Sequence, residues 1–347
     1  MDGASSSLTA ASHVAAPAVC RGCGGALHPF VDLGVSPPCE GFLAAEQVRG
    51  PETFYPLDVH ICPQCWLAQL PEYVAPDAIF TEYAYFSSFS EAWLAHARDY
   101  VAMAATRFGL GAESFAVELA SNDGYLLRNM VAAGIPCLGI EPARNVAAAA
   151  EKIGVPTLVA FFGEALGREL AAKGQAADLI VGNNVLAQVP DLNDFVAGIA
   201  ALLKPEGVVT LEFPHLARLI AGNQFDTIYH EHFSYFSLAS VESLFARHGL
   251  RLFDVEELWT HGGSLRVYGC RRASGRAMEA SVARLLSEED AAGLRDLATY
   301  ADFAARVQKT KHDLLTLLIG LKREGARIAG YGAPGKGNTL LNYCGIR

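Results

Sequence analysis

Residues 115–127, FAVELASNDGYLL, decide the fold. The apolar start of this stretch indicates a short strand that ends in an acid, Glu118, and the turn after it contains one glycine, Gly124. A strand, a glycine-containing turn and a helix form the first crossing of a nucleotide-binding α/β unit. We expect Asn122 and Asp123 to face a ligand at this turn, and Gly124 to let the backbone approach it.

The sequence after this stretch repeats the alternation of strand and helix. Glu141 lies 23 residues after Glu118, where an acid at the end of a second strand accepts hydrogen bonds from both ribose hydroxyls of a nucleoside. The next elements are a strand at 178–182 followed by Asn183 and Asn184, a helix that begins at Asp191 and ends in LLKPEG at 202–207, and a strand at 208–213. This alternation predicts a parallel sheet flanked by helices.

The ordered set resembles the class I S-adenosylmethionine (SAM)-dependent methyltransferases. The resemblance implies that SAM is bound by Glu118, Asn122, Asp123, Gly124, Glu141, Asn183 and Asn184. A nicotinamide dehydrogenase is the main rival, but its first turn requires Gly-x-Gly-x-x-Gly to admit a pyrophosphate. The amide and carboxylate at 122 and 123 suit the amino and carboxylate ends of a methionine better. A Rossmann-like fold without a cofactor is the other alternative.

Composition limits the classes of partner. The chain has 347 residues, of which 51% are hydrophobic and 18% charged, and its net charge is −10. Such a chain fills a large core, and its charge disfavours nucleic acid as a partner. We expect no membrane span, because no apolar run reaches the roughly 20 residues required. Residues 1–17 are predicted to be a loose tail without a signal peptide, which places the protein in the cytoplasm.

Four of the eight cysteines form two knuckles, Cys20-x-x-Cys23 and Cys62-x-x-Cys65. Two such turns complete a tetrahedral site, so we expect a zinc-binding domain at 18–75. The zinc is expected to be structural, because four thiolates leave no open coordination position for a catalytic role. Disulfide pairing is the other alternative, and a cytosolic setting disfavours it.

The C-terminal region differs in character from the core expected at 76–257. We predict a long helix at 299–323 and a strand at 327–330 that leads into a glycine-rich turn. Such a strand and turn normally continue into a helix and further strands. Residues 258–347 are therefore expected to be an incomplete, Rossmann-like substrate-binding domain.

Longer motifs narrow the resemblance. They are YAYFSSFS at 83–90, FFGE at 161–164, TIYHEHFSYFS at 227–237, HGGSLRVY at 261–268 and GYGAPGKGNTLLNYCG at 330–345. With the zinc knuckles, they make residues 18–347 similar to the nucleotide-sugar C-methyltransferases of deoxysugar biosynthesis. Those enzymes add a methyl branch at carbon 3′ of a dTDP-linked 4-keto sugar. A dTDP-linked keto sugar is therefore the substrate that the resemblance implies.

The resemblance also implies a set of catalytic residues. His232 is expected to be the base that removes the proton beside the ketone, with Glu231 orienting or charging it. Tyr229 and Tyr85 are expected near the sugar and the methyl donor. A merely hydrogen-bonded loop is one alternative for this cluster. Metal binding by His230 and His232 is another, although the two lack the i, i+4 spacing of ligands on one helix face.

The glycine-rich turn near the C-terminus nearly fits a phosphate-binding P-loop, but Gly337 replaces the Ser or Thr that holds magnesium. ATP hydrolysis is therefore disfavoured. Lys336 is instead expected to bind the substrate diphosphate, with Arg266 either serving the same anion or forming a surface ion pair. A tight structural turn is the alternative at Lys336.

Two positions depart from the family pattern. Ala120 stands where the family usually has glycine, and SAM binding should survive if its φ is negative. Gln188 stands where the sugar enzymes usually carry histidine, and it cannot shuttle a proton at neutral pH. These departures keep two alternatives open, methyl transfer to oxygen or nitrogen of another small molecule and an inactive binding module.

Overall fold

The computed structural model describes residues 19–39, 41–81, 83–332 and 334–346, so the tail expected at 1–17 lies outside the described residues. Within these residues, no helix combines the length and the apolar character that a membrane span requires.

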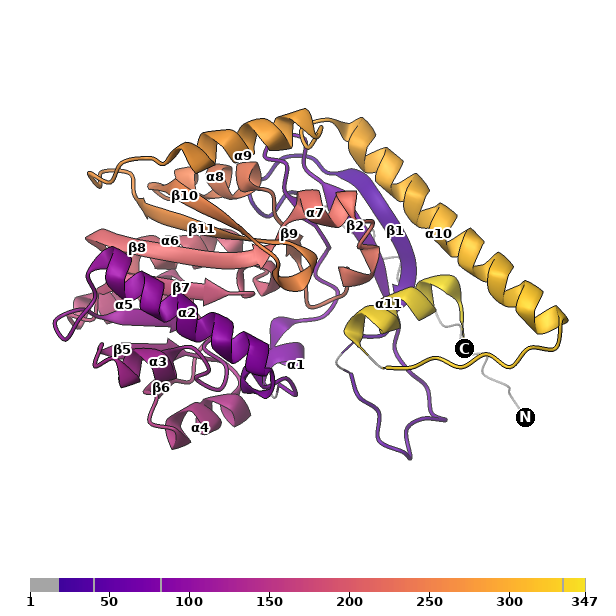
Figure 1. Ribbon diagram of the computed structural model, residues 1–347, viewed down its shortest axis with the longest axis horizontal. Coiled ribbons are helices and arrows are strands. Elements are labelled where there is room, and N and C mark those ends of the chain that lie inside the picture. The colour runs from indigo at the N-terminus through magenta and orange to yellow at the C-terminus, as the bar shows by residue number, and fades with distance from the viewer. Residues whose placement is uncertain (1–18, 40, 82, 333, 347) are drawn as a thin grey trace, which may run out of the picture.

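Seven strands form the larger sheet (Figure 1), in the order β10 (Leu250–Leu258), β11 (Ser264–Arg271), β8 (Leu203–Pro214), β7 (Ala177–Asn183), β4 (Ala116–Leu119), β5 (Cys137–Ile140) and β6 (Thr157–Leu158). Neighbours among β8, β7, β4, β5 and β6 pair in parallel. Strand β11 runs antiparallel to both of its neighbours, β8 and β10. The strands expected at 115–118, 178–182 and 208–213 are confirmed as β4, β7 and β8. The domain boundary expected between residues 257 and 258 falls at the end of β10, inside this one sheet.

Side chains of the central strands alternate between two apolar clusters, as the two-residue period of a strand requires. Ile180 and Val209 belong to one cluster, and their neighbours Leu179 and Val208 belong to the other. The first cluster is completed by α5 (Glu164–Ala172), α6 (Leu192–Leu202), α8 (Leu238–Arg247) and α9 (Ala280–Ala291). The second is completed by α2 (Glu91–Phe108), α3 (Leu127–Ala132) and α4 (Arg144–Lys152). Helices therefore cover both faces of the sheet, as expected.

A smaller antiparallel sheet is formed by β1 (His28–Ser36), β2 (Tyr55–Ile61), β3 (Ala68–Gln69) and β9 (Ser234–Tyr235). Its first three strands belong to the cysteine-rich region, whereas β9 comes from the TIYHEHFSYFS motif far along the chain. The remaining short elements are α1 (Pro76–Phe80), η1 (Ser87–Phe89), η2 (Leu186–Gln188), α7 (Leu216–Ala221), η3 (Phe225–Thr227) and η4 (Thr260–Gly262).

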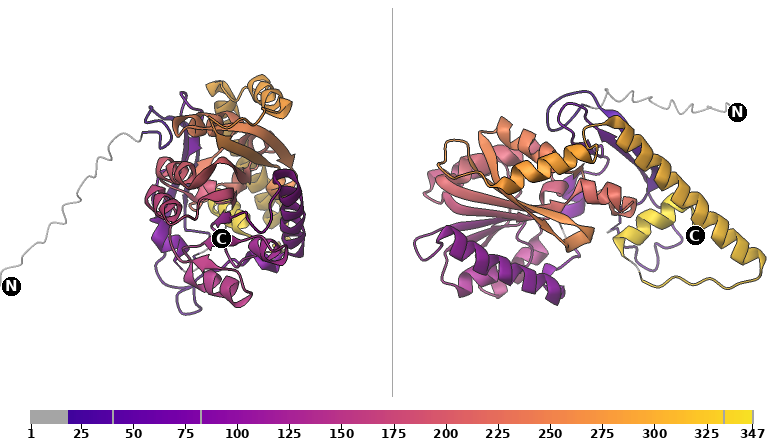
Figure 2. Two further views of the ribbon diagram at one scale, coloured as in Figure 1. Left: turned by 90° about the vertical axis from the view of Figure 1, so that its left-hand side faces the viewer. Right: turned by 45° about the horizontal axis from the view of Figure 1, so that its top comes forward.

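The long helix expected at 299–323 is confirmed as α10 (Leu297–Arg323), and Asp296 caps its first turn by accepting a hydrogen bond from the Ala298 amide. Tyr300 and Phe303 fix its start against Phe30 of β1, with ring centroids 4.9 and 5.2 Å apart. Beyond this contact α10 extends away from the larger sheet, and α11 (Gly335–Cys344) folds back toward β1 (Figure 2).

The strand expected at 327–330 is wrong. The described residues 326–332 contain no strand, and the side chains of Ile328 and Tyr331 are exposed. A strand is stabilised by backbone hydrogen bonds to a neighbouring strand, and none of the described strands pairs with this segment. The apolar pattern is present, but it has no sheet to join.

Candidate functional site

The four knuckle cysteines come together as expected. The sulfur atoms of Cys20, Cys23, Cys62 and Cys65 all lie within 4.8 Å of one another, and three of the four residues are buried. A zinc ion bound to four thiolates at about 2.3 Å needs sulfur atoms about 3.8 Å apart, so the cluster fits the ion. Its four sulfurs fill the coordination shell, which gives the zinc a structural role.

Gln69 connects this cluster to the smaller sheet. Its side-chain Nε2 donates to the Cys20 sulfur over 3.2 Å, and its backbone pairs with Ser234 of β9. The hydrogen bonds from Cys65 and Gln69 lower the pKa of the Cys20 thiol to about 4, so this sulfur is a ready metal ligand.

The residues expected to bind SAM lie at one edge of the larger sheet. Strands β7, β4 and β5 are neighbours, and their carboxyl ends carry Asn183, Glu118 and Glu141. In open parallel sheets, ligands bind outside these carboxyl ends. The sheet topology therefore places the three predicted residues around one location.

The turn after β4, residues 119–124, is called the cofactor turn. Ala120, Asn122 and Gly124 have φ of 56°, 49° and 78°. Asparagine and glycine tolerate this left-handed region, but alanine does not adopt it readily. The condition of a negative φ at Ala120 is therefore not met, because the turn keeps the conformation that a glycine would serve there.

Gly124 also lies close to its neighbours. A Cβ at this position would lie 3.0 Å from Cγ2 of Val155 and 3.2 Å from Cβ of Ala150. The lack of a side chain thus lets the turn pack against α4 and the residues after it, in addition to permitting its positive φ.

Side chains of the cofactor turn hold the YAYFSSFS motif in place. The Asn122 Oδ1 accepts a hydrogen bond from the Ser87 amide over 2.9 Å, and its Nδ2 donates to the Tyr85 carbonyl over 3.1 Å. The Asp123 carboxylate accepts from the Ser88 amide over 3.1 Å. Tyr85 is thereby fixed beside the turn, with its side chain about half exposed.

Glu141 stabilises the same turn from β5. One carboxylate oxygen accepts from the Asn122 amide and the other from the Ala143 amide, each over 2.8 Å. Burial raises the pKa of Glu141, and the two amides oppose that rise. Each oxygen keeps a second lone pair for a ligand hydroxyl.

The edge of the sheet has more buried hydrogen-bond acceptors than donors. Within the described chain, both oxygens of Glu118, Oγ of Ser121, Oδ1 of Asp123 and Oδ1 of Asn184 are buried without a hydrogen-bond partner. Burial raises the pKa of Glu118 well above its usual range. The Tyr125 hydroxyl accepts a hydrogen bond from Asn183 over 3.4 Å. It lies close enough to Glu118 to oppose the rise in the Glu118 pKa, but the two side chains do not meet hydrogen-bond geometry.

Unpartnered buried polar groups are costly, and in native proteins they commonly mark a binding site. SAM carries an ammonium group, two ribose hydroxyls and a positive sulfonium. These residues therefore fit SAM, because its donors and positive charge match the surplus of acceptors.

The motif at 227–237, called the catalytic segment, is held by the smaller sheet. Ser234 and Tyr235 pair with β3, and the Leu70 amide donates to the Phe233 carbonyl over 3.0 Å. His230 is bound to the same region, because its Nε2 donates to the Pro56 carbonyl over 3.1 Å. His230 is thus a structural residue of the segment.

His232 has the geometry of a base. Its Nδ1 donates to the Thr227 carbonyl over 3.2 Å, so the neutral ring presents an unprotonated Nε2. Burial lowers the pKa of His232 to about 4, and the positive charge of Lys336 adds to this effect. The ring lies against Tyr229, with centroids 4.1 Å apart. The imidazole is therefore neutral at physiological pH, and the backbone fixes its tautomer at Nδ1.

Glu231 connects three other regions to the catalytic segment. Its carboxylate accepts from Tyr83 over 3.5 Å and from Cys39 over 3.4 Å, and Cys39 also lies next to Gly335. No sequence pattern indicates a role for Cys39. It is only partly buried, and it joins the cysteine-rich region to the turn that bears Lys336.

Lys336 follows Gly335, which lies beside Cys39, the partner of Glu231 in the catalytic segment, whereas Arg266 is engaged inside the protein. The Arg266 side chain is buried and pairs with Glu212 over 2.8 Å and with Glu256 over 3.2 Å. It is therefore not a surface ion pair, and two carboxylates neutralise its charge. We leave it out of the proposed substrate site.

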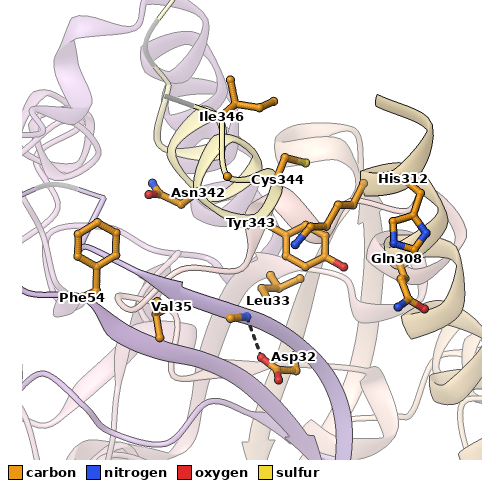
Figure 3. A pocket seen from close by; sticks show the side chains of 13 residues that line it. Asp32, Leu33, Val35, Phe54, Gln308, His312, Asn342, Tyr343, Cys344 and Ile346 are labelled. Carbon is orange, nitrogen blue, oxygen red and sulfur yellow. Dashed lines mark hydrogen bonds between the residues drawn. The ribbon is translucent and has the colours of Figure 1, made fainter. Parts of the chain in front are cut away.

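A separate cavity of about 630 Å³ lies between β1, α10 and α11 (Figure 3). Its lining includes Asp32, Lys311 and Tyr343, with the Lys311 ammonium over the Tyr343 ring. None of the residues predicted to bind SAM, zinc or substrate lines it.

Three family models match the chain, and together they cover most of it. A "Putative zinc binding domain" matches residues 20–80, a methyltransferase domain matches 93–255, and a C-methyltransferase C-terminal domain matches 259–347. The matches confirm the class I α/β core and the zinc-binding region that the sequence predicted.

The C-methyltransferase NovU of Streptomyces niveus is 39% identical over 331 residues, which cover 94% of this chain and 78% of NovU. Among solved structures, the magnesium protoporphyrin IX methyltransferase of Synechocystis with bound SAM is 14% identical, covers 51% of this chain and 79% of its own, and has a TM-score of 0.39. A SAM-dependent methyltransferase of Anabaena variabilis is 12% identical over 50% and 84% of the two chains, with a TM-score of 0.41. Neither structural likeness is close enough to support an argument.

Proposed function

The chain belongs to the family of SAM-dependent C-methyltransferases that carry a structural zinc domain, and we propose that it methylates a dTDP-linked 4-keto deoxysugar at a carbon beside the ketone. The observation that supports this most is His232, a neutral imidazole whose Nδ1 donates to the Thr227 carbonyl and whose Nε2 is therefore unprotonated. A C–H bond beside a ketone is acidic enough for such a base, because the resulting charge delocalises onto oxygen.

The cofactor turn supplies the binding site for the methyl donor in this proposal. Glu141 accepts hydrogen bonds from the ribose hydroxyls, and Glu118 with Asp123 balances the ammonium group. Asn183 and Asn184 line the same edge of the sheet. Bound there, SAM supplies an electrophilic methyl group on a positive sulfur.

The catalytic segment provides the base. His232 removes the proton through Nε2 while the Thr227 carbonyl holds its Nδ1–H. Tyr229 packs on the imidazole, and Tyr85, fixed beside the cofactor turn, borders the reacting groups. Glu231 acts as a positioning residue, because it joins the segment to Tyr83 and Cys39.

Lys336 is proposed to bind the substrate diphosphate through its charge, since the preceding Gly335 lies beside Cys39, which contacts Glu231 of the catalytic segment. A cytoplasmic location is part of the proposal, since zinc thiolates persist in reducing compartments.

The test uses the full chain with dTDP-4-keto-6-deoxyglucose and SAM labelled with ¹³C in its methyl group. We expect a new methyl signal that is coupled through carbon to the ring, and loss of the proton beside the ketone. A methyl bound to oxygen or nitrogen would contradict C-methylation. No product despite SAM binding would favour an inactive binding module.

A further inference from the structure

The loop between β10 and β11 presents a histidine in an unusual backbone conformation. His261, Gly262 and Gly263 have φ of 52°, 84° and 118°, three consecutive residues in the positive region. Glycine adopts this region freely, but a branched or ring-bearing side chain at positive φ costs about 1–2 kcal/mol. Strain of this kind persists only where the surroundings enforce it, and it is common at functional sites.

The surroundings do enforce it. The Thr260 hydroxyl donates to the buried Glu212 carboxylate over 3.0 Å, and the Thr260 carbonyl accepts from Ser264 over 2.9 Å. Gln224 donates to the Gly262 carbonyl over 2.9 Å. The loop is therefore fixed at both ends, and its conformation is not a result of looseness.

Because β10 runs parallel to β8, this loop follows the carboxyl end of β10, the same edge of the sheet that carries the cofactor turn. The His261 ring lies edge-on to Trp93, with centroids 5.4 Å apart, and Trp93 stacks on Tyr125 beside Asn183. Aromatic contacts thus link His261 to the residues predicted to bind SAM.

The loop also lies beside the segment that bears the base. Gln224, whose side chain donates to the Gly262 carbonyl, accepts a hydrogen bond from the Thr227 amide over 3.1 Å, and the Thr227 carbonyl accepts from His232 over 3.2 Å. His261 is exposed overall, and within the described chain its ring nitrogens make no hydrogen bond. An imidazole without a hydrogen-bond partner, held in a strained loop beside the catalytic segment, is available to a ligand.

We propose that His261 is a further catalytic residue, which donates a hydrogen bond to the ketone oxygen of the substrate while His232 removes the neighbouring proton. This inference rests on the proposed function. A neutral imidazole always has one N–H to donate. Donors aimed at the oxygen that becomes negative are usually the largest single contribution to such a reaction.

The His232 Nε2 takes the proton, and the electrons of the C–H bond form the C=C bond of an enolate whose oxygen accepts the N–H of His261. The enolate carbon then forms a bond to the methyl group as the methyl–sulfur bond breaks, which releases S-adenosylhomocysteine. The C=O bond re-forms, and His232 returns its proton to water.

The test compares His261→Gly, His261→Asn and His312→Gln in the full chain, with dTDP-4-keto-6-deoxyglucose as the probe. His261→Gly removes the donor and relieves the positive φ, so its thermal midpoint should equal or exceed that of the wild type. We expect kcat to fall by about 100- to 1,000-fold with KM within threefold. His261→Asn tolerates the same φ and keeps an N–H, so it should recover part of the rate. His312, exposed on α10, is the control and should leave kcat unchanged.

A second readout is hydrogen–deuterium exchange beside the ketone in the presence of S-adenosylhomocysteine. Because the donor stabilises the enolate, exchange should fall in parallel with methyl transfer in His261→Gly. Unchanged exchange, or kcat within threefold of the wild type, would overturn the inference alone. If the wild type forms no C-methyl product, the proposed function fails, and the inference fails with it.

Discussion

The cofactor turn and the catalytic segment serve one site, but different parts of the chain hold them in place. The turn is fixed by its own sheet, through Glu141 on the adjacent strand and through Asn122 within the turn. The segment is fixed by the zinc-bearing region, through β3 and through the Pro56 carbonyl. Binding of the methyl donor and removal of the proton should therefore respond differently to damage in the two regions.

The largest expected effect comes from the zinc site. Cys62→Ser removes one of four ligands, so the knuckles and β3 lose their crosslink and the catalytic segment loses its support. We expect methyl transfer to fall at least about 100-fold while the Kd for SAM changes less than about threefold. Metal analysis measures the zinc content, calorimetry measures the Kd for SAM, and product formation measures the rate of methyl transfer.

Cys344→Ser is the matched control, because Cys344 is buried but lies outside the cluster. It should keep its zinc and its rate. If Cys62→Ser lost SAM affinity as strongly as activity, the two regions would not be independent.

A smaller effect is expected at the cofactor turn, and here the Kd for SAM is the quantity that should change. Glu141→Gln removes the charge that binds two amides and is proposed to bind the ribose, so the Kd for SAM should rise about 10- to 100-fold. Calorimetry with SAM measures it, and Glu151→Gln on the exposed side of α4 is the control. A Kd within twofold of the wild type would remove Glu141 from the cofactor site.

The pH dependence distinguishes the two regions again. The pKa of His232 is lowered to about 4, so its imidazole stays neutral as pH falls through the range where an ordinary histidine is protonated. The acid side of the kcat/KM profile should therefore fall about tenfold per pH unit only below about pH 4, or where the protein unfolds. A decline centred near pH 6.5 would show that the base has an ordinary environment.

The smallest effect concerns strain in the cofactor turn. Ala120→Gly should stabilise the protein by about 0.5–1 kcal/mol, because the gain at positive φ exceeds the entropy cost of glycine. Ala133→Gly is the matched control, since Ala133 has φ of −84° and should lose stability on the same change. Thermal unfolding measures the stability of both variants. An equal shift of the thermal midpoint in the two would show that Ala120 is not strained.

The sequence predicted what depends on neighbouring residues. The strand–turn–helix around Glu118, the acid at Glu141 and the two cysteine knuckles are local patterns, and the structure assembles each as expected. The resemblance to a known family then placed His232 in the site.

Long-range pairing was harder to predict. Nothing in Ser234 and Tyr235 indicates that they complete the zinc-bearing sheet, and nothing in Cys39 indicates contact with Glu231. The expected strand at 327–330 failed for the same reason, since an apolar run becomes a strand only when a neighbouring strand is available. The positive φ at Ala120 could not be predicted from the sequence either, because the turn keeps its shape whichever residue occupies the position.

In the proposed reaction, the cofactor turn binds SAM while the catalytic segment moves the proton. His232→Ala tests it most directly, when SAM binding and deuterium uptake beside the ketone of dTDP-4-keto-6-deoxyglucose are measured on the same preparation. We predict a Kd for SAM within about twofold of the wild type and exchange at least about 100-fold slower. Undiminished exchange in His232→Ala would contradict the account.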